Sequence, residues 1–222
     1  MLARLPRGCG AVGSAPAWHA GGQGFESPQL HVDLIEQHRL SLDQWRRTVE
    51  SVGPQDWHAP TPCSEWNVRD LVNHVVGEDR WTGPLMEGRT IPDVGDALDG
   101  DLLGADPKVS ARAAADEAET VVAERLPADP VVHLSYGDEK AAEYVAQLVA
   151  DHLIHSWDLA AAVGAGRELD PGLVDEVARW WADREHLYRS GGMVADRPDV
   201  TADSPQDRLL VAGGRDPSWS AG

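Results

Sequence analysis

The chain has 222 residues, enough for one domain of ordinary size with a substantial hydrophobic core. It carries a formal charge of −18, so its electric field repels nucleic acid and anionic membrane surfaces, and we expect neither as a partner. Cys9 and Cys63 are too few for a disulfide framework or a cysteine-rich zinc site. The sequence also lacks a long apolar stretch and a signal-peptide pattern, so we expect a soluble protein of the reducing cytoplasm.

Residues 1–31 show neither a helical nor a strand period, and their glycine, alanine, proline and serine content predicts a disordered leader. A second interpretation is that the leader is not native. Residues 15–21 and 22–28 can be back-translated as two arms of a transfer-RNA gene. In that case translation would begin near Val32, and the genomic DNA under codons 1 to 31 tests the hypothesis.

An amphipathic helix is predicted over residues 33–52, where apolar side chains recur at steps of three and four. An ordered loop follows at residues 57–66, with a tryptophan at each end. Asn67 is a favourable N-cap for a second helix, which passes through His74 and ends near Trp81.

Residues 83–107 are rich in glycine, proline and aspartate, which predicts a long connection. A third helix is predicted over residues 108–126, and the apolar run at residues 131–136 has the length of a short extended segment. The most regular pattern in the chain predicts a fourth helix over residues 140–163, ended by Gly164.

A fifth helix is predicted from Leu173 to Leu187, and the segment after residue 190 looks mostly irregular. These elements predict an all-α domain over residues 32–190 and a tail at residues 191–222. The first predicted helix and the face that carries Trp180 and Trp181 are expected to drive homodimerisation, since exposed indoles favour association.

Two side chains in the fourth helix suggest a metal site. Asp151 and His155 stand four residues apart, so both project from one helix face, about 6 Å from each other. A carboxylate oxygen and a neutral imidazole nitrogen suit Zn²⁺, Ni²⁺ or Fe²⁺. His74 is the candidate third ligand, because it lies mid-helix in an apolar stretch and needs a polar partner when buried. His152 shares a face with His155 and is an alternative to Asp151.

Each of these residues also has an ordinary structural interpretation, since helical histidines commonly form hydrogen bonds in or near a core. Asp158 could accept a hydrogen bond from the His155 imidazole or simply lie on the helix surface. Cys63 is more often a packing residue than a nucleophile. Trp57 and Trp66 are expected to anchor their loop rather than to line a pocket.

Two segments, residues 57–74 and 151–164, resemble the motifs of the DinB-like family that contains the metal-binding domain of mycothiol-dependent maleylpyruvate isomerase. Residues 208–219 resemble the C-terminal signature of one subgroup. The resemblance implies a DinB-like four-helix bundle with an extra C-terminal helix. It also implies one divalent ion, most simply zinc, with nickel or iron as alternatives, held by His74, Asp151 and His155.

Two functions from different classes are considered, of which the resemblance implies the first. One is an isomerase or thiol transferase that activates a low-molecular-weight thiol, such as mycothiol, towards a small electrophile. The other is a metal-binding module without turnover, acting as a carrier, a sensor or a stress-response partner. Two differences from the isomerase bear on the choice: Asp151 is shorter than the glutamate found there, and no additional C-terminal domain follows. The sequence does not place a general acid or base, such as Glu65 or Glu78, at the metal.

Overall fold

The computed structural model describes residues 28–221, with side chains from Asp33 onward. The prediction of a disordered or non-native leader therefore falls, for residues 1–27, outside the described part. Within that part the chain is mostly helical and contains a single two-stranded sheet. The all-α class predicted from the sequence is confirmed.

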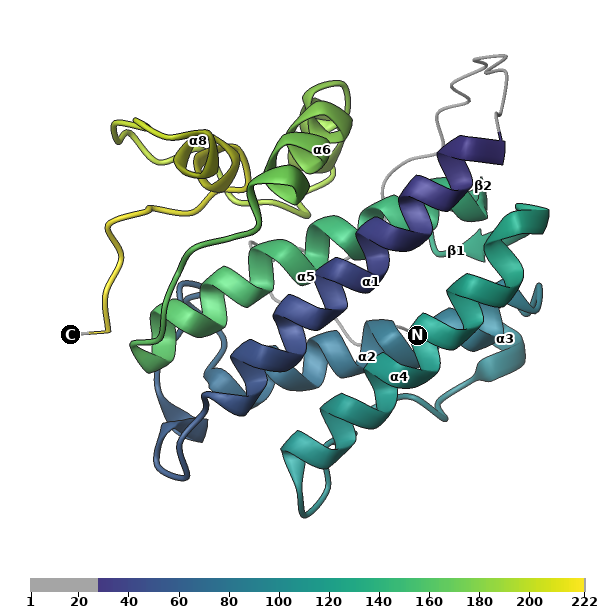
Figure 1. The fold of residues 1–222 in the computed structure, drawn as a ribbon. Coiled ribbons are helices and arrows are strands. Elements are labelled where there is room, and N and C mark those ends of the chain that lie inside the picture. The colour runs from purple at the N-terminus through teal and green to yellow at the C-terminus, as the bar shows by residue number, and fades with distance from the viewer. Residues whose placement is uncertain (1–27, 222) are drawn as a thin grey trace.

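Four long helices form the body of the fold: α1 (Pro28–Glu50), α2 (Val68–Met86), α4 (Pro107–Arg125) and α5 (Ala141–Val163). Figure 1 shows α1 and α5 running side by side, with α2 and α4 on one side of them. Helix α1 packs on α5 and α4, and α2 packs on the same two helices. Across residues 28–221 no helix combines the length and the apolar character needed to cross a membrane.

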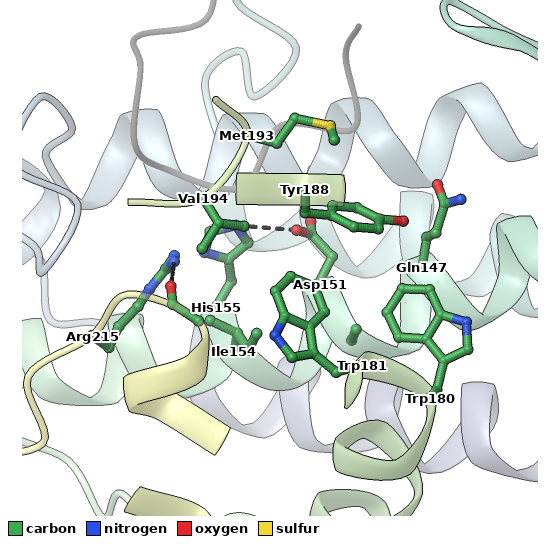
Figure 2. Close-up of a pocket in the computed structure, with 12 residues that line it drawn as sticks. Gln147, Asp151, Ile154, His155, Trp180, Trp181, Tyr188, Met193, Val194 and Arg215 are labelled. Atoms are coloured by element: carbon green, nitrogen blue, oxygen red, sulfur yellow. Dashed lines mark hydrogen bonds and ion pairs between the residues drawn. The ribbon is translucent and has the colours of Figure 1, made fainter. Parts of the chain in front are cut away.

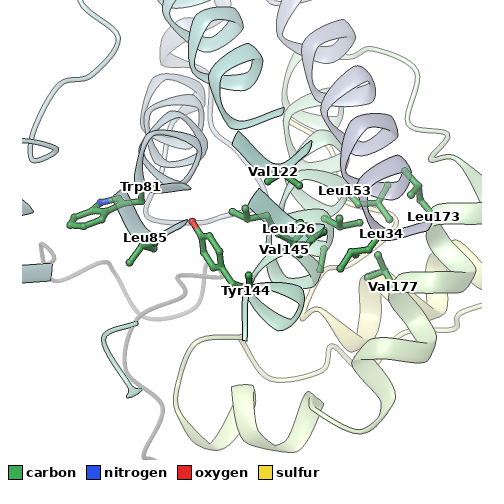
Figure 3. Packing of buried hydrophobic residues seen from close by; sticks show 14 of the residues in the cluster. Leu34, Trp81, Leu85, Val122, Leu126, Tyr144, Val145, Leu153, Leu173 and Val177 are labelled. Atoms are coloured by element: carbon green, nitrogen blue, oxygen red, sulfur yellow. The ribbon is translucent and has the colours of Figure 1, made fainter. Parts of the chain in front are cut away.

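The apolar stripes predicted from the sequence are the buried faces of these helices. On α1, Leu42 and Trp45 are fully buried, and Val49 is 2% exposed. Figure 3 shows part of the largest buried cluster, in which Leu34 of α1 meets Leu153 of α5. Helix α4 buries four alanines, Ala111, Ala114, Ala115 and Ala118, and the first two share a core cluster with α2. Small side chains of this kind allow helices to pack closely.

The ends of the two helices that carry the candidate ligands follow from local chemistry. Asn67 and Asp70 form a capping box at the start of α2, each side chain accepting a hydrogen bond from the backbone N–H of the other. Gly164 ends α5 with φ 68°, a conformation that costs glycine little. Helix α2 continues beyond the predicted end and through Pro84, because Met86 is 2% exposed and packs in the core.

Other boundaries also differ from the predictions. Helix α1 begins at Pro28 instead of residue 33, with the proline at a position where its missing N–H costs nothing. The predicted connection contains the one-turn helix α3 (Ile91–Val94). The extended run forms β1 (Val131–Leu134), which pairs antiparallel with β2 (Gly137–Lys140), and the sequence predicted no partner strand. Short 3-10 turns occupy two further segments, η1 (Asp56–His58) and η2 (Leu126–Ala128).

The predicted fifth helix is wrong as a single element, since it consists of α6 (Pro171–Ala182) and α7 (Glu185–Ser190). At the break, Arg184 donates a hydrogen bond to the Trp180 carbonyl and forms an ion pair of 2.6 Å with Glu143 of α5. The tail is largely irregular, as predicted, but it also contains α8 (Pro205–Ala212). Helix α8 packs on α6, and both lie together beside α5 in Figure 1.

Candidate metal centre

The structure brings together the three residues that the sequence singled out. His74 lies on α2, and Asp151 and His155 lie one turn apart on α5. Asp151 Oδ2 is 3.2 Å from His74 Nε2, and Asp151 Oδ1 is 3.3 Å from His155 Nε2. One potential ligand atom of each residue lies within 4.8 Å of the other two. The carboxylate therefore stands between two imidazole nitrogens, an arrangement that could hold one cation.

The two nitrogens of His155 have different surroundings. Nδ1 lies 2.9 Å from Asp158 Oδ2 and donates its hydrogen to that carboxylate. The other nitrogen, Nε2, is buried and has no hydrogen-bond partner among the described residues, although Asp151 lies at ion-pair distance. A buried ring nitrogen costs free energy unless something satisfies it. The residues present thus fit a metal ion, which would occupy the lone pair of Nε2.

Asp158 is buried at 0% exposure, so its interpretation as a surface residue is wrong, and its predicted hydrogen bond to His155 is confirmed. Burial raises the pKa of Asp158, but the Arg215 guanidinium and His155 outweigh burial and hold that pKa below its ordinary value. Arg215 Nη2 lies 2.8 Å from Asp158 Oδ2. Asp158 therefore stays ionised and fixes the orientation of the His155 ring.

Arg215 is the residue at this site that sequence reasoning missed. It lies in the irregular tail, is 5% exposed, and also donates a 2.6 Å hydrogen bond to the Gly213 carbonyl. The only sequence signal was its place within residues 208–219, the segment that resembles a C-terminal signature. The tail is thereby tied to the helix that carries two of the candidate ligands.

Charge coupling at the site is strong. Burial would raise the pKa of Asp151, but His155 and His74 outweigh it and hold that pKa well below its ordinary value. Burial would lower the pKa of His155, but Asp151 and Asp158 together raise it to about 9. Without a metal ion the cluster therefore binds a proton at neutral pH, at the position where a cation would bind.

His152, the alternative ligand, lies in a different environment. Its Nε2 is 2.8 Å from Asp79 Oδ1 of α2, and its Nδ1 is 3.4 Å from Ser41 Oγ of α1. Its ring is fully buried beside the His38 ring, at a centroid distance of 5.5 Å. Both ring nitrogens have partners away from the cluster, so the structure separates His152 from the candidate ligands.

The loop before α2 also contributes to the site. The Trp66 ring lies 4.8 Å from the His74 ring and 5.9 Å from the His155 ring, so Trp66 covers the cluster as well as anchoring its loop. Trp57 packs against the core, as predicted. Cys63 lies within ligand distance of His155 and Asp158, but the described residues include no free cysteine, so neither ligation nor nucleophilic attack is assigned to it.

Two carboxylates named as general acid or base candidates differ in setting. Glu65 is exposed on its loop. Glu78 lies on α2, one turn after His74 and on the same face. Burial and the charges of Asp151 and Asp79 raise the pKa of Glu78 to about 8. Glu78 is therefore the carboxyl group near the cluster that holds a proton at neutral pH.

A pocket opens beside the cluster, with Asp151 and His155 in its lining. Figure 2 shows Asp151 between Tyr188 and Trp181, with His155 on the side of Val194 and Arg215. Trp181 is 5% exposed, and Trp180 is partly buried and donates an N–H to Glu143. Neither indole is fully exposed, and homodimerisation stays a prediction.

The comparisons with known proteins identify the family. The sequence profile of the mycothiol maleylpyruvate isomerase N-terminal domain matches residues 38–160. The chain belongs to this family. Two uncharacterized proteins of Mycobacterium tuberculosis, from the strains CDC 1551 / Oshkosh and ATCC 25618 / H37Rv, are each 30% identical over 196 residues. The alignments cover 83% of this chain and 98% of each relative. No solved structure matches the chain significantly.

The family match covers α2 and most of α5, and so it contains all three candidate ligands. It ends at residue 160, before α6, α7, α8 and Arg215. The matched part of the chain thus holds the candidate ligands, while most of the pocket wall lies beyond it.

Proposed function

We propose that this protein binds one divalent metal ion through His74 Nε2, one oxygen of Asp151 and His155 Nε2. The observation that carries the proposal is the buried His155 Nε2, which lacks a hydrogen bond within the described chain while Asp158 holds the opposite nitrogen. A carboxylate that orients a ligand histidine in this way is a common feature of protein metal sites. A set of two imidazoles and one carboxylate suits zinc best, with nickel and iron as alternatives.

We further assign α1, α2, α4 and α5 to a DinB-like four-helix bundle, with α6 as the extra helix. The pairwise packing of these helices supports the assignment, because α1 and α2 each contact both α4 and α5. Bundles of this kind build metal sites from side chains on facing helices, as α2 and α5 do here.

Three protein ligands leave a coordination position open, which is the arrangement of catalytic rather than structural sites. A divalent ion held there would supply a Lewis acid, which lowers the pKa of a bound thiol or water. We therefore propose an isomerase or thiol transferase that uses a low-molecular-weight thiol, such as mycothiol, and a small electrophile. The family to which the chain belongs supports the thiol, and the pocket beside Asp151 supports turnover over simple storage.

The protein's own residues have separate parts in this proposal. Asp158 keeps the hydrogen on His155 Nδ1 and leaves Nε2 as a ligand. Trp66 lies against both histidine rings and limits the access of water to them. Glu78, one helical turn after His74, holds a proton on its carboxyl group at neutral pH.

The metal content of the full-length protein tests the proposal. The protein is purified without chelator or nickel affinity resin, and its metals are quantified by plasma mass spectrometry. The double variant His74→Ala, His155→Ala is compared with a matched control, His133→Ala, His186→Ala, whose two histidines lie outside the cluster. We expect about one equivalent of metal in the wild type and the control, and none in the cluster variant.

Equal metal in both double variants, or an empty wild type after reconstitution with zinc, would refute the metal site. A loaded protein is then assayed for conjugation or isomerisation with mycothiol and a panel of small electrophiles. Thiol consumption that requires both the metal and His155 supports the enzyme. Tight metal binding without turnover of any electrophile would contradict the enzyme and favour a metal carrier or sensor.

A further inference from the structure

The pocket beside the candidate metal centre has two unlike ends. Its floor is α5, where Asp151 and His155 form the polar end. The other end is built by Trp180 and Trp181 of α6 and by Tyr188 of α7, and Figure 2 shows these rings grouped together. A molecule that fills the pocket must therefore place different chemical groups at its two ends.

The aromatic end is a compact set of three rings. The centroids of Trp180 and Trp181 are 5.9 Å apart, and Tyr188 lies 5.9 Å from the first and 5.0 Å from the second. Met193 and Val194 extend the apolar wall and are 5% and 7% exposed. Rings at these distances bind a further flat apolar group by stacking or edge contacts.

The arginines at both ends of the pocket already have partners. Arg184 lies over the Trp180 ring and is paired with Glu143. Arg215, which lines the pocket, is paired with Asp158. A charged ligand group at the aromatic end would have to disrupt one of these pairs, which would leave a poorly solvated charge behind. The charges therefore favour an uncharged occupant there.

Two pocket residues carry buried polar atoms that lack a hydrogen bond within residues 28–221. These are Trp181 Nε1, which can donate one hydrogen bond, and Gln147 Oε1, which can accept. Unpaired buried groups are uncommon in folded proteins, and each needs a partner such as an ordered water, an ion or a ligand. One donor and one acceptor match a ring with one or two polar substituents. They do not match a polyhydroxylated molecule, most of whose hydroxyl groups would remain unpaired.

We propose that the aromatic end of this pocket binds a flat, uncharged ring of the substrate while the substrate's reactive polar group reaches Asp151 and His155. This inference rests on the proposed function, in which a thiol and an electrophile meet at the metal. It assigns the pocket to the electrophile and identifies that reactant as an aromatic or similarly flat apolar compound. The thiol then approaches from outside the aromatic end.

The first experiment does not depend on the metal. Binding of indole and of myo-inositol to the metal-depleted full-length protein is measured by saturation-transfer NMR and calorimetry. Indole is expected to bind at least about 10-fold more tightly, because its ring leaves water while inositol loses hydrogen bonds to water. Val194→Trp fills the pocket and should abolish indole binding, whereas Val200→Trp, the same change at an exposed position of the same segment, should leave it intact.

A second pair of variants covers the case in which Val194→Trp does not fold. Trp181→Leu removes one wall of the aromatic end, and Trp57→Leu removes a half-buried tryptophan outside the pocket. The first should weaken indole binding at least about 5-fold and the second should not. Indole binding that is absent in the wild type, or unchanged in both pocket variants, overturns the inference.

The second experiment uses the zinc-loaded protein with benzohydroxamate and acetohydroxamate, two metal-binding probes that differ by a ring. The ring should strengthen binding at least about 10-fold, and this preference should disappear in Val194→Trp but not in Val200→Trp. Equal affinities for the two probes would overturn the assignment of the substrate class while leaving the metal site intact. A protein that takes up no zinc would refute the proposed function. The indole measurement would still show whether the aromatic end binds a flat, uncharged ring.

Discussion

Replacing Asp158 by asparagine should destabilise the metal-free protein strongly. The change keeps the size of the side chain and removes its charge, which leaves the Arg215 guanidinium without a counter-ion. Arg215 Nη2 lies 2.8 Å from Asp158, and both side chains are almost completely buried, at 4% and 0% exposure. Solvent therefore screens this pair very little, in contrast to an ion pair on the surface.

Removing one partner of a buried ion pair commonly costs about 3–5 kcal/mol. Arg215 keeps its hydrogen bond to the Gly213 carbonyl, and asparagine can still accept from His155. We therefore expect a loss of about 3 kcal/mol, the lower end of that range. A domain of this kind unfolds with about 5–15 kcal/mol, so the loss is a large fraction of its stability.

Urea denaturation of the full-length, metal-free protein at neutral pH, followed by tryptophan fluorescence, measures the effect. Glu176→Gln is the matched control, because it removes the same kind of charge from the exposed pair with Arg179 and should cost less than about 1 kcal/mol. Adding Arg215→Gln to Asp158→Asn should restore part of the lost stability, since no uncompensated charge remains. If Asp158→Asn costs no more than the control, the buried pair does not stabilise the site. The claim that Arg215 ties the C-terminal tail to α5 is then refuted.

Three further predictions concern stability in urea, and the first of them has a counterpart in metal affinity. The pKa of His155 is raised from 6.5 to about 9, so its ion pair with Asp151 stabilises the metal-free protein fully below pH 6.5 and is lost as the pH rises through 9. Metal affinity should change oppositely, rising over the same range, because the ion competes with a proton for His155. Gly164→Ala should cost about 1 kcal/mol, because alanine is strained at φ 68°. Asn67→Ala should also cost about 1 kcal/mol by removing the cap of α2.

Each of these predictions has a result that contradicts it. For His155 this is an unchanged urea midpoint between pH 6.5 and 9, with His155→Gln as the control that removes the dependence. For Gly164 it is a stability equal to that of Gly83→Ala, since Gly83 is helical and a Cβ there meets nothing within 4 Å. For Asn67 it is a free energy of unfolding equal to that of the wild type, since the change removes the side chain that accepts the hydrogen bond from the Asp70 N–H.

The sequence predicted best the elements that local physics determines. Helix α5 was predicted to within a residue, because its apolar pattern is long and Gly164 ends it. The common face of Asp151 and His155 follows from helix geometry alone. The distance between His74 and these residues depends on how α2 packs on α5, and spacing along the chain carries no such information. The family resemblance supplied that step.

Long-range contacts account for what the sequence did not show. Spacing could not choose between Asp151 and His152, and the choice follows from the buried Asp79 on another helix, which holds the His152 ring away from the cluster. The break between α6 and α7 accompanies an ion pair of Arg184 with a residue 41 positions earlier. Arg215 lies 57 positions after its partner Asp158, in a segment whose sequence shows no helical or strand period.

The ion pair between Arg215 and Asp158 also bears on the biosynthesis of the protein. A ribosome adds residues from the N-terminus, so the helices with the three candidate ligands are synthesised well before Arg215. Until that residue emerges, Asp158 lacks the guanidinium that favours its ionised form and thereby helps to orient His155. We therefore expect the site to mature only after Arg215 has been released. A nascent chain stalled before this position should capture metal poorly even when α2 and α5 have already folded.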